Sequence, residues 1–331
     1  MKKEELRIVF MGTPEFAVGT LRRLVDGGYR VVAVVTQPDK PVGRHQDTLQ
    51  PSAVKQYAME RNIPVLQPVK MKDPDFVEQL RAYRADVQVV VAFRMLPEVV
   101  WSMPRFGTFN VHAALLPQYR GAAPINWAII NGETQTGVTT FFLDHDIDTG
   151  RIILQRPFEI KDDYNVENVY DGLMELGAEA AVTTLDMILD GDGTVKSLPQ
   201  DELLPTAGEL HDAPKIFKET CCVDWNKSGK SVYDFVRGLS PIPGAWSVLV
   251  APDGKQSVFK IYRTAKTDLP ADGAPGTIVT ERNKLYVATA DRMIELCEVQ
   301  PAGKKRMKAA DFLNGFRGGL DDYRFTSELN S

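Results

Sequence analysis

An asparagine and a histidine lie two positions apart in the segment Asn110-Val111-His112. Side chains alternate between the two faces of a strand, so the carboxamide and the imidazole are expected on the same face. A carboxamide can donate to an oxyanion, and an imidazole can take or deliver a proton near neutral pH. A lone histidine is more often structural or at the surface. The pair nevertheless predicts a site for acid–base chemistry.

Three carboxylates follow in the segment 144–150, which reads DHDIDTG. An EF-hand calcium loop requires glycine at its sixth position and glutamate at its twelfth. Here those positions hold Thr149 and Gln155, so we predict no metal site. Two interpretations stay open. The segment is either a solvated turn or a loop that directs one carboxylate toward a histidine elsewhere in the chain.

The residues around these segments predict the elements that position them. Continuous apolar runs alternate with segments of helical periodicity, which is typical of a mostly parallel α/β sheet. Ligands bind such sheets beyond the carboxyl ends of the strands, where Asn110 and His112 are expected. We predict strands at 6–11, 31–35, 87–92, 108–112, 137–143 and 152–158, and helices from 14 to 27, at 75–83 and at 165–189.

The pattern changes after Gly191-Asp192-Gly193. Residues 191–209 are polar and contain Pro199 and Pro205, which predicts a linker. Short apolar runs separated by Gly, Pro and Asp clusters then predict a small β barrel or sandwich. We therefore expect a catalytic region at 1–190, a second domain at 210–318, and a loosely held tail at 319–331.

Composition excludes several classes of protein. The 331 residues carry 39 basic and 44 acidic side chains, a net charge of −5, which disfavours a polybasic nucleic-acid binder. Residues 209–331 hold 18 basic and 16 acidic side chains, so the acidity lies mostly in residues 1–208. The three cysteines have no CxxC spacing, and neither a secretory signal nor an apolar stretch of about 18 residues is present. These features predict a cytoplasmic protein.

A glycine turn follows the first predicted strand at Gly12-Thr13-Pro14-Glu15. Dinucleotide-binding proteins have G-x-G-x-x-G at this place, because the glycines let the backbone approach the pyrophosphate closely. This turn has one glycine, and Pro14 is a favourable first residue of a helix. The turn therefore disfavours an NAD-dependent dehydrogenase.

Several motifs in the same order resemble those of the 10-formyltetrahydrofolate-dependent formyltransferases: Asn110-Val111-His112, Leu115-Leu116-Pro117, Arg120-Gly121-Ala122-Ala123-Pro124 and Asp148-Thr149-Gly150. Three further segments resemble the members of this family that act on methionyl-tRNA: residues 12–17, 36–44 and 300–305. The resemblance extends from about Leu6 to Leu313.

The resemblance implies a Rossmann-like catalytic domain followed by an OB-like β barrel. It implies transfer of the formyl group of 10-formyltetrahydrofolate to the α-amino group of methionine on initiator tRNA, by a monomer without a metal. Asn110 and His112 are then expected to stabilise the oxyanion and assist proton transfer. Asp148 is expected to orient His112 and favour its charged form. The remaining implied roles are folate contact by Ala114, Leu115, Leu116 and Pro117, and tRNA contact by Arg44, Lys304 and Lys305.

The sequence departs from the family pattern in four places. Ala114 replaces a usual serine, and Asp146 replaces a usual glycine. The loop at Ala92-Phe93-Arg94 is one residue shorter than usual and normally approaches the pterin. The segment 45–47 lacks the lysines that many members have.

The sequence leaves three alternatives to a tRNA formyltransferase. A sibling enzyme could formylate a sugar-nucleotide amine with the same three residues. The loop at 36–51 and the segment 301–305 instead suit a macromolecular substrate. An inert folate- or RNA-binding protein is disfavoured, because Asn110, His112 and Asp148 are all present. A dehydrogenase is disfavoured by the turn at residues 12–15.

Overall fold

The computed structural model describes residues 1–42, 48–204, 208–316, 319–320 and 322–327. The chain divides into two compact units. Unit 1 comprises Met1–Gly121, Gln135–Glu159 and Tyr170–Asp212, and unit 2 comprises Ala122–Thr134, Ile160–Val169 and Ala213–Ser331. Within the described ranges, none of the helices combines the length and hydropathy that a membrane span requires.

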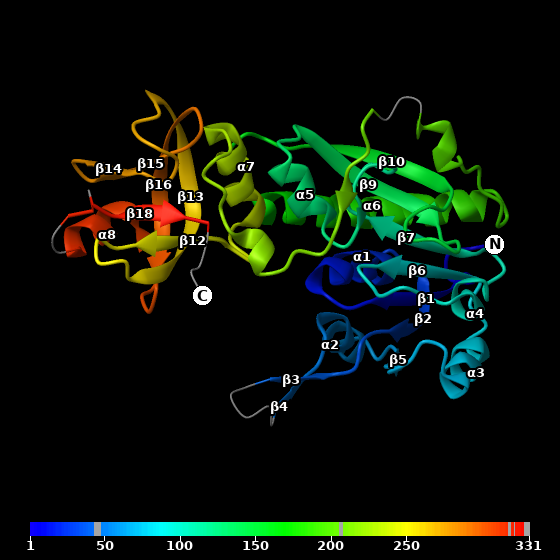
Figure 1. The fold of residues 1–331 in the computed structure, drawn as a ribbon. Helices are drawn as coiled ribbons and strands as arrows, with labels where there is room; N and C mark the ends of the chain where they lie inside the picture. The colour runs from blue at the N-terminus through cyan, green and yellow to red at the C-terminus, as the bar shows by residue number, and fades with distance from the viewer. Residues whose placement is uncertain (43–47, 205–207, 317–318, 321, 328–331) are drawn as a thin grey trace. The chain divides into compact units, whose positions relative to one another are not determined.

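Unit 1 is built on a mixed, mostly parallel sheet with the strand order β10-β9-β7-β6-β1-β2-β5 (Figure 1). Strands β7, β6, β1, β2 and β5 run parallel to one another, whereas β9 and β10 are antiparallel to their neighbours. The strands are β1 (Arg7–Gly12), β2 (Arg30–Val35), β5 (Val65–Leu66), β6 (Val87–Val91), β7 (Thr108–His112), β9 (Gln135–Phe142) and β10 (Ile152–Glu159).

The short elements β3 (Lys40–Val42) and β4 (Thr48–Gln50) pair with each other in an antiparallel ladder. The remaining elements up to residue 213 are α1 (Glu15–Asp26), α2 (Ala53–Glu60), α3 (Pro74–Ala82), α4 (Glu98–Trp101), β8 (Arg120–Gly121), α5 (Pro124–Ile130), α6 (Val166–Asp190), η1 (Gln200–Glu202) and β11 (Asp212–Ala213). Residues 124–130 and the first turn of α6 belong to unit 2.

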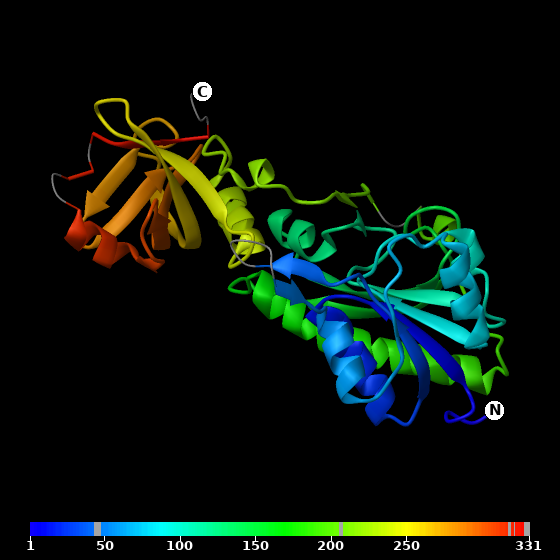
Figure 2. The ribbon, with the colours of Figure 1, turned by 90° about the horizontal axis from the view of Figure 1, so that it is seen from below.

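Helices cover both faces of the unit 1 sheet. The side chains of Val9 and Met11 pack with those of α3 and α4 in one cluster, which also contains Phe76 and Val100. On the other face α1 packs beside α6, as Figure 2 shows, and the Cβ that any other residue would place at Gly19 would lie 2.8 Å from Met174. Burial on both faces explains why the central strands read as continuous apolar runs.

Unit 2 contains an antiparallel sheet with the strand order β14-β15-β16-β13-β12-β18, and β17 pairs with β16. A bridge between Thr277 and Arg324 joins the two ends of this order, so the sheet curls into a barrel-like form. The elements are η3 (Glu219–Cys221), α7 (Gly229–Leu239), β12 (Ala245–Val250), β13 (Gln256–Pro270), β14 (Ile278–Glu281), β15 (Lys284–Ala288), β16 (Arg292–Pro301), β17 (Met307–Lys308), α8 (Ala309–Gly315) and β18 (Arg324–Thr326).

Aromatic side chains fill the interior of this barrel. Phe325 of β18 stacks on Trp225 with ring centroids 5.6 Å apart and meets Phe259 edge-on at 5.2 Å. The Nε1 of Trp225 donates to Ser247 Oγ over 2.9 Å, which satisfies the buried indole. The predicted fold class, a mostly parallel α/β domain followed by a small antiparallel barrel, is confirmed.

The structure differs from the sequence-based predictions in two segments. The prediction of a loosely held tail was wrong for residues 324–326, because β18 pairs with β12 and places Phe325 in the core. The segment predicted as a linker, 191–209, lies in unit 1 as far as it is described. Leu198 forms a bridge with Ile152 at the start of β10, so part of this segment is packed against the sheet.

Candidate active site

Strand β7 places Asn110 and His112 on one face of the unit 1 sheet. Asn110 lies opposite Val90 of β6 and Phe141 of β9 in the strand register. Between Asn110 and His112, Val111 points to the other face, where it approaches Gly177 of α6. Asn110 is half-buried, and its carboxamide has no hydrogen-bond partner among the described residues. It is therefore available to donate to a bound molecule.

The imidazole of His112 is 6% exposed and held on two sides. Its Nε2 lies 2.9 Å from the carbonyl oxygen of Tyr119. Because a carbonyl oxygen can only accept, Nε2 carries a proton in this arrangement. The ring of Phe141 meets the imidazole edge-on, with centroids 6.4 Å apart. The other nitrogen, Nδ1, faces the carboxylate of Asp148.

Asp148 supplies that carboxylate from the loop between β9 and β10. Its Oδ2 lies 3.7 Å from Nδ1 of His112 and accepts the backbone N–H of Gly121 over 3.0 Å. The first separation is longer than a hydrogen bond, and catalytic contacts often tighten only when substrate binds. Of the two interpretations of the acidic loop, the structure therefore agrees with the one in which a carboxylate faces a histidine.

The backbone of this loop is constrained. Asp148 has φ of +56°, in the left-handed region that aspartate tolerates better than most residues. A Cβ at Gly150 would lie 1.6 Å from the carbonyl oxygen of Phe142, so the close approach of the loop to the end of β9 requires glycine. Asp144 Oδ1 accepts from the N–H of Asp146 and from the Thr149 hydroxyl. These contacts direct the Asp148 carboxylate toward His112.

Sequence reasoning missed Gln200, which supports the same loop. Its Nε2 donates to the carbonyl oxygens of Asp148, over 2.8 Å, and of Gly150, over 2.9 Å. Its Oε1 accepts from the Arg120 guanidinium. No local pattern singles out this residue, because it follows Pro199 in a polar stretch that resembles a linker.

The segment 114–117, predicted to contact folate, borders the site. Ala114 and Leu116 are buried, and Leu115 is half-buried with its side chain against Gly137. The Thr139 hydroxyl donates to the Ala114 carbonyl and accepts from the Leu116 N–H. Pro117 is also buried. The side chains other than Leu115 are thus engaged within the protein.

Arg94 braces the loop at 92–94. Its guanidinium donates to the carbonyl oxygen of Val69 over 2.9 Å and to that of Pro68. Burial lowers the pKa of this guanidinium. Arg94 therefore ties the loop after β6 to the segment after β5.

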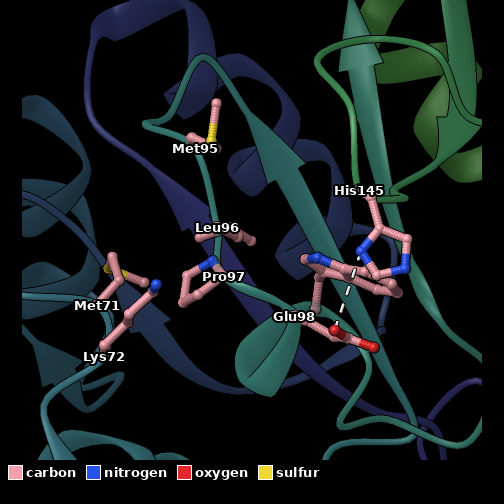
Figure 3. Close-up of a pocket in the computed structure, with 8 residues that line it drawn as sticks. Met71, Lys72, Met95, Leu96, Pro97, Glu98 and His145 are labelled. Carbon is pink, nitrogen blue, oxygen red and sulfur yellow. Dashed lines mark ion pairs between the residues drawn. The ribbon is translucent and has the colours of Figure 1, made fainter.

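A pocket of about 300 Å³ lies beside this brace (Figure 3). Figure 3 shows Met71 and Lys72 on one side, Glu98 and His145 on the other, and Leu96 and Pro97 between them. The Nδ1 of His145 lies 3.9 Å from Oε2 of Glu98. Met95 and Trp101 complete the lining. The pocket is thus largely apolar with a few polar groups, and His145 belongs to the loop that carries Asp148.

The predicted tRNA-binding residues do not share one element. Lys304 and Lys305 are exposed in the turn after β16, in unit 2. Arg306 beside them pairs with Glu298, and this contact lowers the pKa of the Glu298 carboxyl. Arg44 lies outside the described residues. Across the described ranges, no group of three His, Cys, Asp or Glu side chains is placed to hold a metal ion.

Comparison with known proteins identifies relatives over nearly the whole chain. A family model described as "Formyl transferase" matches residues 6–185, and one described as "Formyl transferase, C-terminal domain" matches residues 215–317. The methionyl-tRNA formyltransferase of Parabacteroides distasonis is 59% identical over 318 residues, which cover 96% of this chain and 98% of the relative. The Bacteroides fragilis relative of the same name is 58% identical, with 96% and 97% covered.

Solved structures share the fold at lower identity. WlaRD, a sugar 3N-formyl transferase crystallised in the presence of dTDP and 5-N-formyl-THF, has a TM-score of 0.63 at 18% identity and covers 91% of this chain and 99% of its own. HypX from Aquifex aeolicus, in complex with tetrahydrofolic acid, has a TM-score of 0.61 at 21% identity, with 93% and 47% covered. At these identities the likeness shows the fold alone.

Proposed function

The chain belongs to the methionyl-tRNA formyltransferase family, and from this membership we propose that it transfers the formyl group of 10-formyltetrahydrofolate to the α-amino group of methionine on initiator tRNA. The product, a formylated Met-tRNA, serves translation initiation. The observation that carries the proposal is the identity of 57–59% with curated relatives of that name over 96% of the chain. Fold alone is shared by enzymes with other acceptors.

The chemistry is assigned to Asn110, His112 and Asp148. The α-amino nitrogen attacks the formyl carbon, a C–N bond forms, and the formyl oxygen becomes an oxyanion. Asn110 donates to that oxyanion, a role supported by its unpartnered carboxamide. The bond from the formyl carbon to N10 then breaks, the former amine loses a proton, and N10 gains one as tetrahydrofolate leaves.

His112 moves the proton, and Asp148 orients the imidazole of His112. The Nε2 of His112 is engaged with the Tyr119 carbonyl, so Nδ1 is the atom assigned to proton transfer. The Asp148 carboxylate faces Nδ1 and stabilises positive charge that develops on the ring during transfer.

The folate is assigned to unit 1, which also carries Asn110, His112 and Asp148. The pterin occupies the pocket lined by Leu96, Trp101 and His145, an assignment supported by the apolar lining and by the loop at 92–94. The segment 114–117 forms the adjoining wall, where Leu115 and main-chain atoms make the contacts. A structure of the folate complex would test this placement of the pterin and of the segment 114–117.

The tRNA is assigned to residues 210–318 together with Arg44. Lys304 and Lys305 contact phosphates, which is supported by their exposure. The chemistry is assigned to unit 1, which includes residues 191–209 as far as they are described. The enzyme acts as a monomer in the cytoplasm.

A three-acceptor assay tests the function. Purified protein is incubated with 10-formyltetrahydrofolate and, separately, Met-tRNA, free methionine or a sugar-nucleotide amine. Formylation of Met-tRNA alone is the expected result. Formylation of the sugar amine alone would instead identify the sibling activity, and no transfer to any acceptor would support an inert binding protein.

A further inference from the structure

Gln200 is a buried residue to which the mechanism above assigns no role. Its side chain is 2% exposed, although it lies in η1, a short helical turn in a polar stretch. A carboxamide has two N–H donors and a carbonyl oxygen with two lone pairs. Burial without partners for these groups is costly, so the contacts that Gln200 makes need an explanation.

All of these donors and acceptors form hydrogen bonds, and their partners lie in the two loops that carry Arg120 and Asp148. The two Nε2 bonds go to the carbonyl oxygens of Asp148 and Gly150, at 2.8 and 2.9 Å. The Oε1 accepts from Nε of Arg120 over 3.2 Å and from its Nη2 over 2.6 Å.

These bonds close a ring of contacts. Gln200 holds Asp148 through its carbonyl, the Asp148 carboxylate accepts the N–H of Gly121, and the neighbouring Arg120 returns to Gln200. The carbonyl of Tyr119, one residue before Arg120, is the group that holds His112. One glutamine thus links the turn that positions the imidazole to the loop that positions the carboxylate.

We infer that Gln200 is a positioning residue for formyl transfer: it holds the Asp148 loop in its left-handed conformation, so that the carboxylate faces Nδ1 of His112. The inference rests on the proposed function. It requires a glutamine in particular, because a carboxylate lacks the two donors and an apolar side chain lacks both donors and acceptor.

The test compares Gln200→Ala and Gln200→Glu with the wild type in the Met-tRNA assay. Partners that orient the ligands of a metal site are typically worth about 10–100-fold in activity. We expect kcat to fall by roughly the same factor here, while KM for folate and tRNA changes less than about threefold. Gln200→Glu keeps an acceptor for Arg120 but loses the donors to the loop, and it should therefore be as impaired as Gln200→Ala. Full activity of Gln200→Glu would overturn the inference.

A double-mutant cycle separates positioning from folding. If Gln200 acts through the carboxylate, adding Gln200→Ala to Asp148→Asn should lower kcat less than about threefold. An equal loss in both backgrounds would overturn the inference. Asp201→Ala is the matched control, because its exposed side chain lies in the same turn. It should retain wild-type kcat.

Hydrogen–deuterium exchange gives a readout that does not depend on activity. Peptides covering residues 144–150 should exchange faster in Gln200→Ala than in the wild type, with peptides from β1 and β6 unchanged. If the wild type were inactive in the Met-tRNA assay, the proposed function would be refuted. Faster exchange at 144–150 in Gln200→Ala would still show that Gln200 holds this loop. Unchanged exchange at 144–150 would refute the hold itself.

Discussion

Nδ1 of His112 and Oδ2 of Asp148 face each other across 3.7 Å, while Nε2 of the same imidazole is occupied by the Tyr119 carbonyl. The two ring nitrogens therefore have different environments. One is fixed by the backbone, and the other meets a carboxylate that is itself held by the N–H of Gly121. In the proposed mechanism, this asymmetry leaves Nδ1 as the ring atom that moves the proton.

Replacing Asp148 by asparagine should lower kcat by about 100-fold or more, because the orienting charge is lost. The amide oxygen can still accept from Gly121, so the melting temperature should change by less than about 3 °C. Steady-state kinetics and a thermal melt measure the two effects. His112→Ala combined with Asp148→Asn should be little worse than His112→Ala alone, since groups that act as a unit are not additive. Fully multiplicative losses would contradict the pairing.

Asn110→Ala should lower kcat by about 100–1000-fold, the usual loss for one oxyanion donor. The free energy of unfolding should change by less than about 1 kcal/mol, because the carboxamide has no partner among the described residues. Single-turnover formylation and urea unfolding measure these quantities. Asn168→Ala is a control at an exposed site, where the side chain accepts from the N–H of Asn165. It should keep full activity, and a comparable loss there would refute the assignment.

Lys304→Ala and Lys305→Ala should weaken tRNA binding and reduce its salt dependence. Each lost phosphate contact should lower the slope of log K against log salt by about one unit. Filter binding over a range of salt concentrations measures the slope. Lys284→Ala is the control, because its ammonium is already paired with Glu295 at 2.9 Å. KM for the folate should stay constant, and an equal effect of all three substitutions would argue against a specific tRNA contact.

Arg306→Gln should destabilise the protein more at neutral pH than in acid. The Arg306 hydrogen bond lowers the pKa of Glu298, so the folded state gains stability above the unfolded carboxyl's pKa of about 4.3. That gain disappears as the pH falls through the lowered pKa. A surface pair of this kind contributes about 0.2–1 kcal/mol.

Urea unfolding of the Arg306→Gln variant and the wild type, at several values between pH 7 and pH 3, measures the difference. It should shrink toward acid, apart from a constant part due to the contact of Arg306 with the Tyr262 ring. In a Glu298→Gln background the pH dependence of the difference should vanish. A difference that stays constant with pH in the native background would refute the role of the ion pair.

Local sequence patterns determined the strands and their faces. Continuous apolar runs marked the buried strands, and the range predicted for β7, 108–112, is that of the structure. Alternation along a strand placed Asn110 and His112 on one face, because the side-chain period in a strand is fixed by backbone geometry. The roles carried over from the family resemblance, including the folate and tRNA contacts, stay predictions.

Tertiary structure decided the contacts between residues far apart in the chain. Gln200 meets Asp148 across 52 positions and Arg120 across 80, and no local period reports such a meeting. The antiparallel direction of β9 and the pairing of β18 likewise depend on the path of the chain. Hydrophobic periodicity reports which side of an element is buried, whereas the partner of a polar group depends on where distant loops come together.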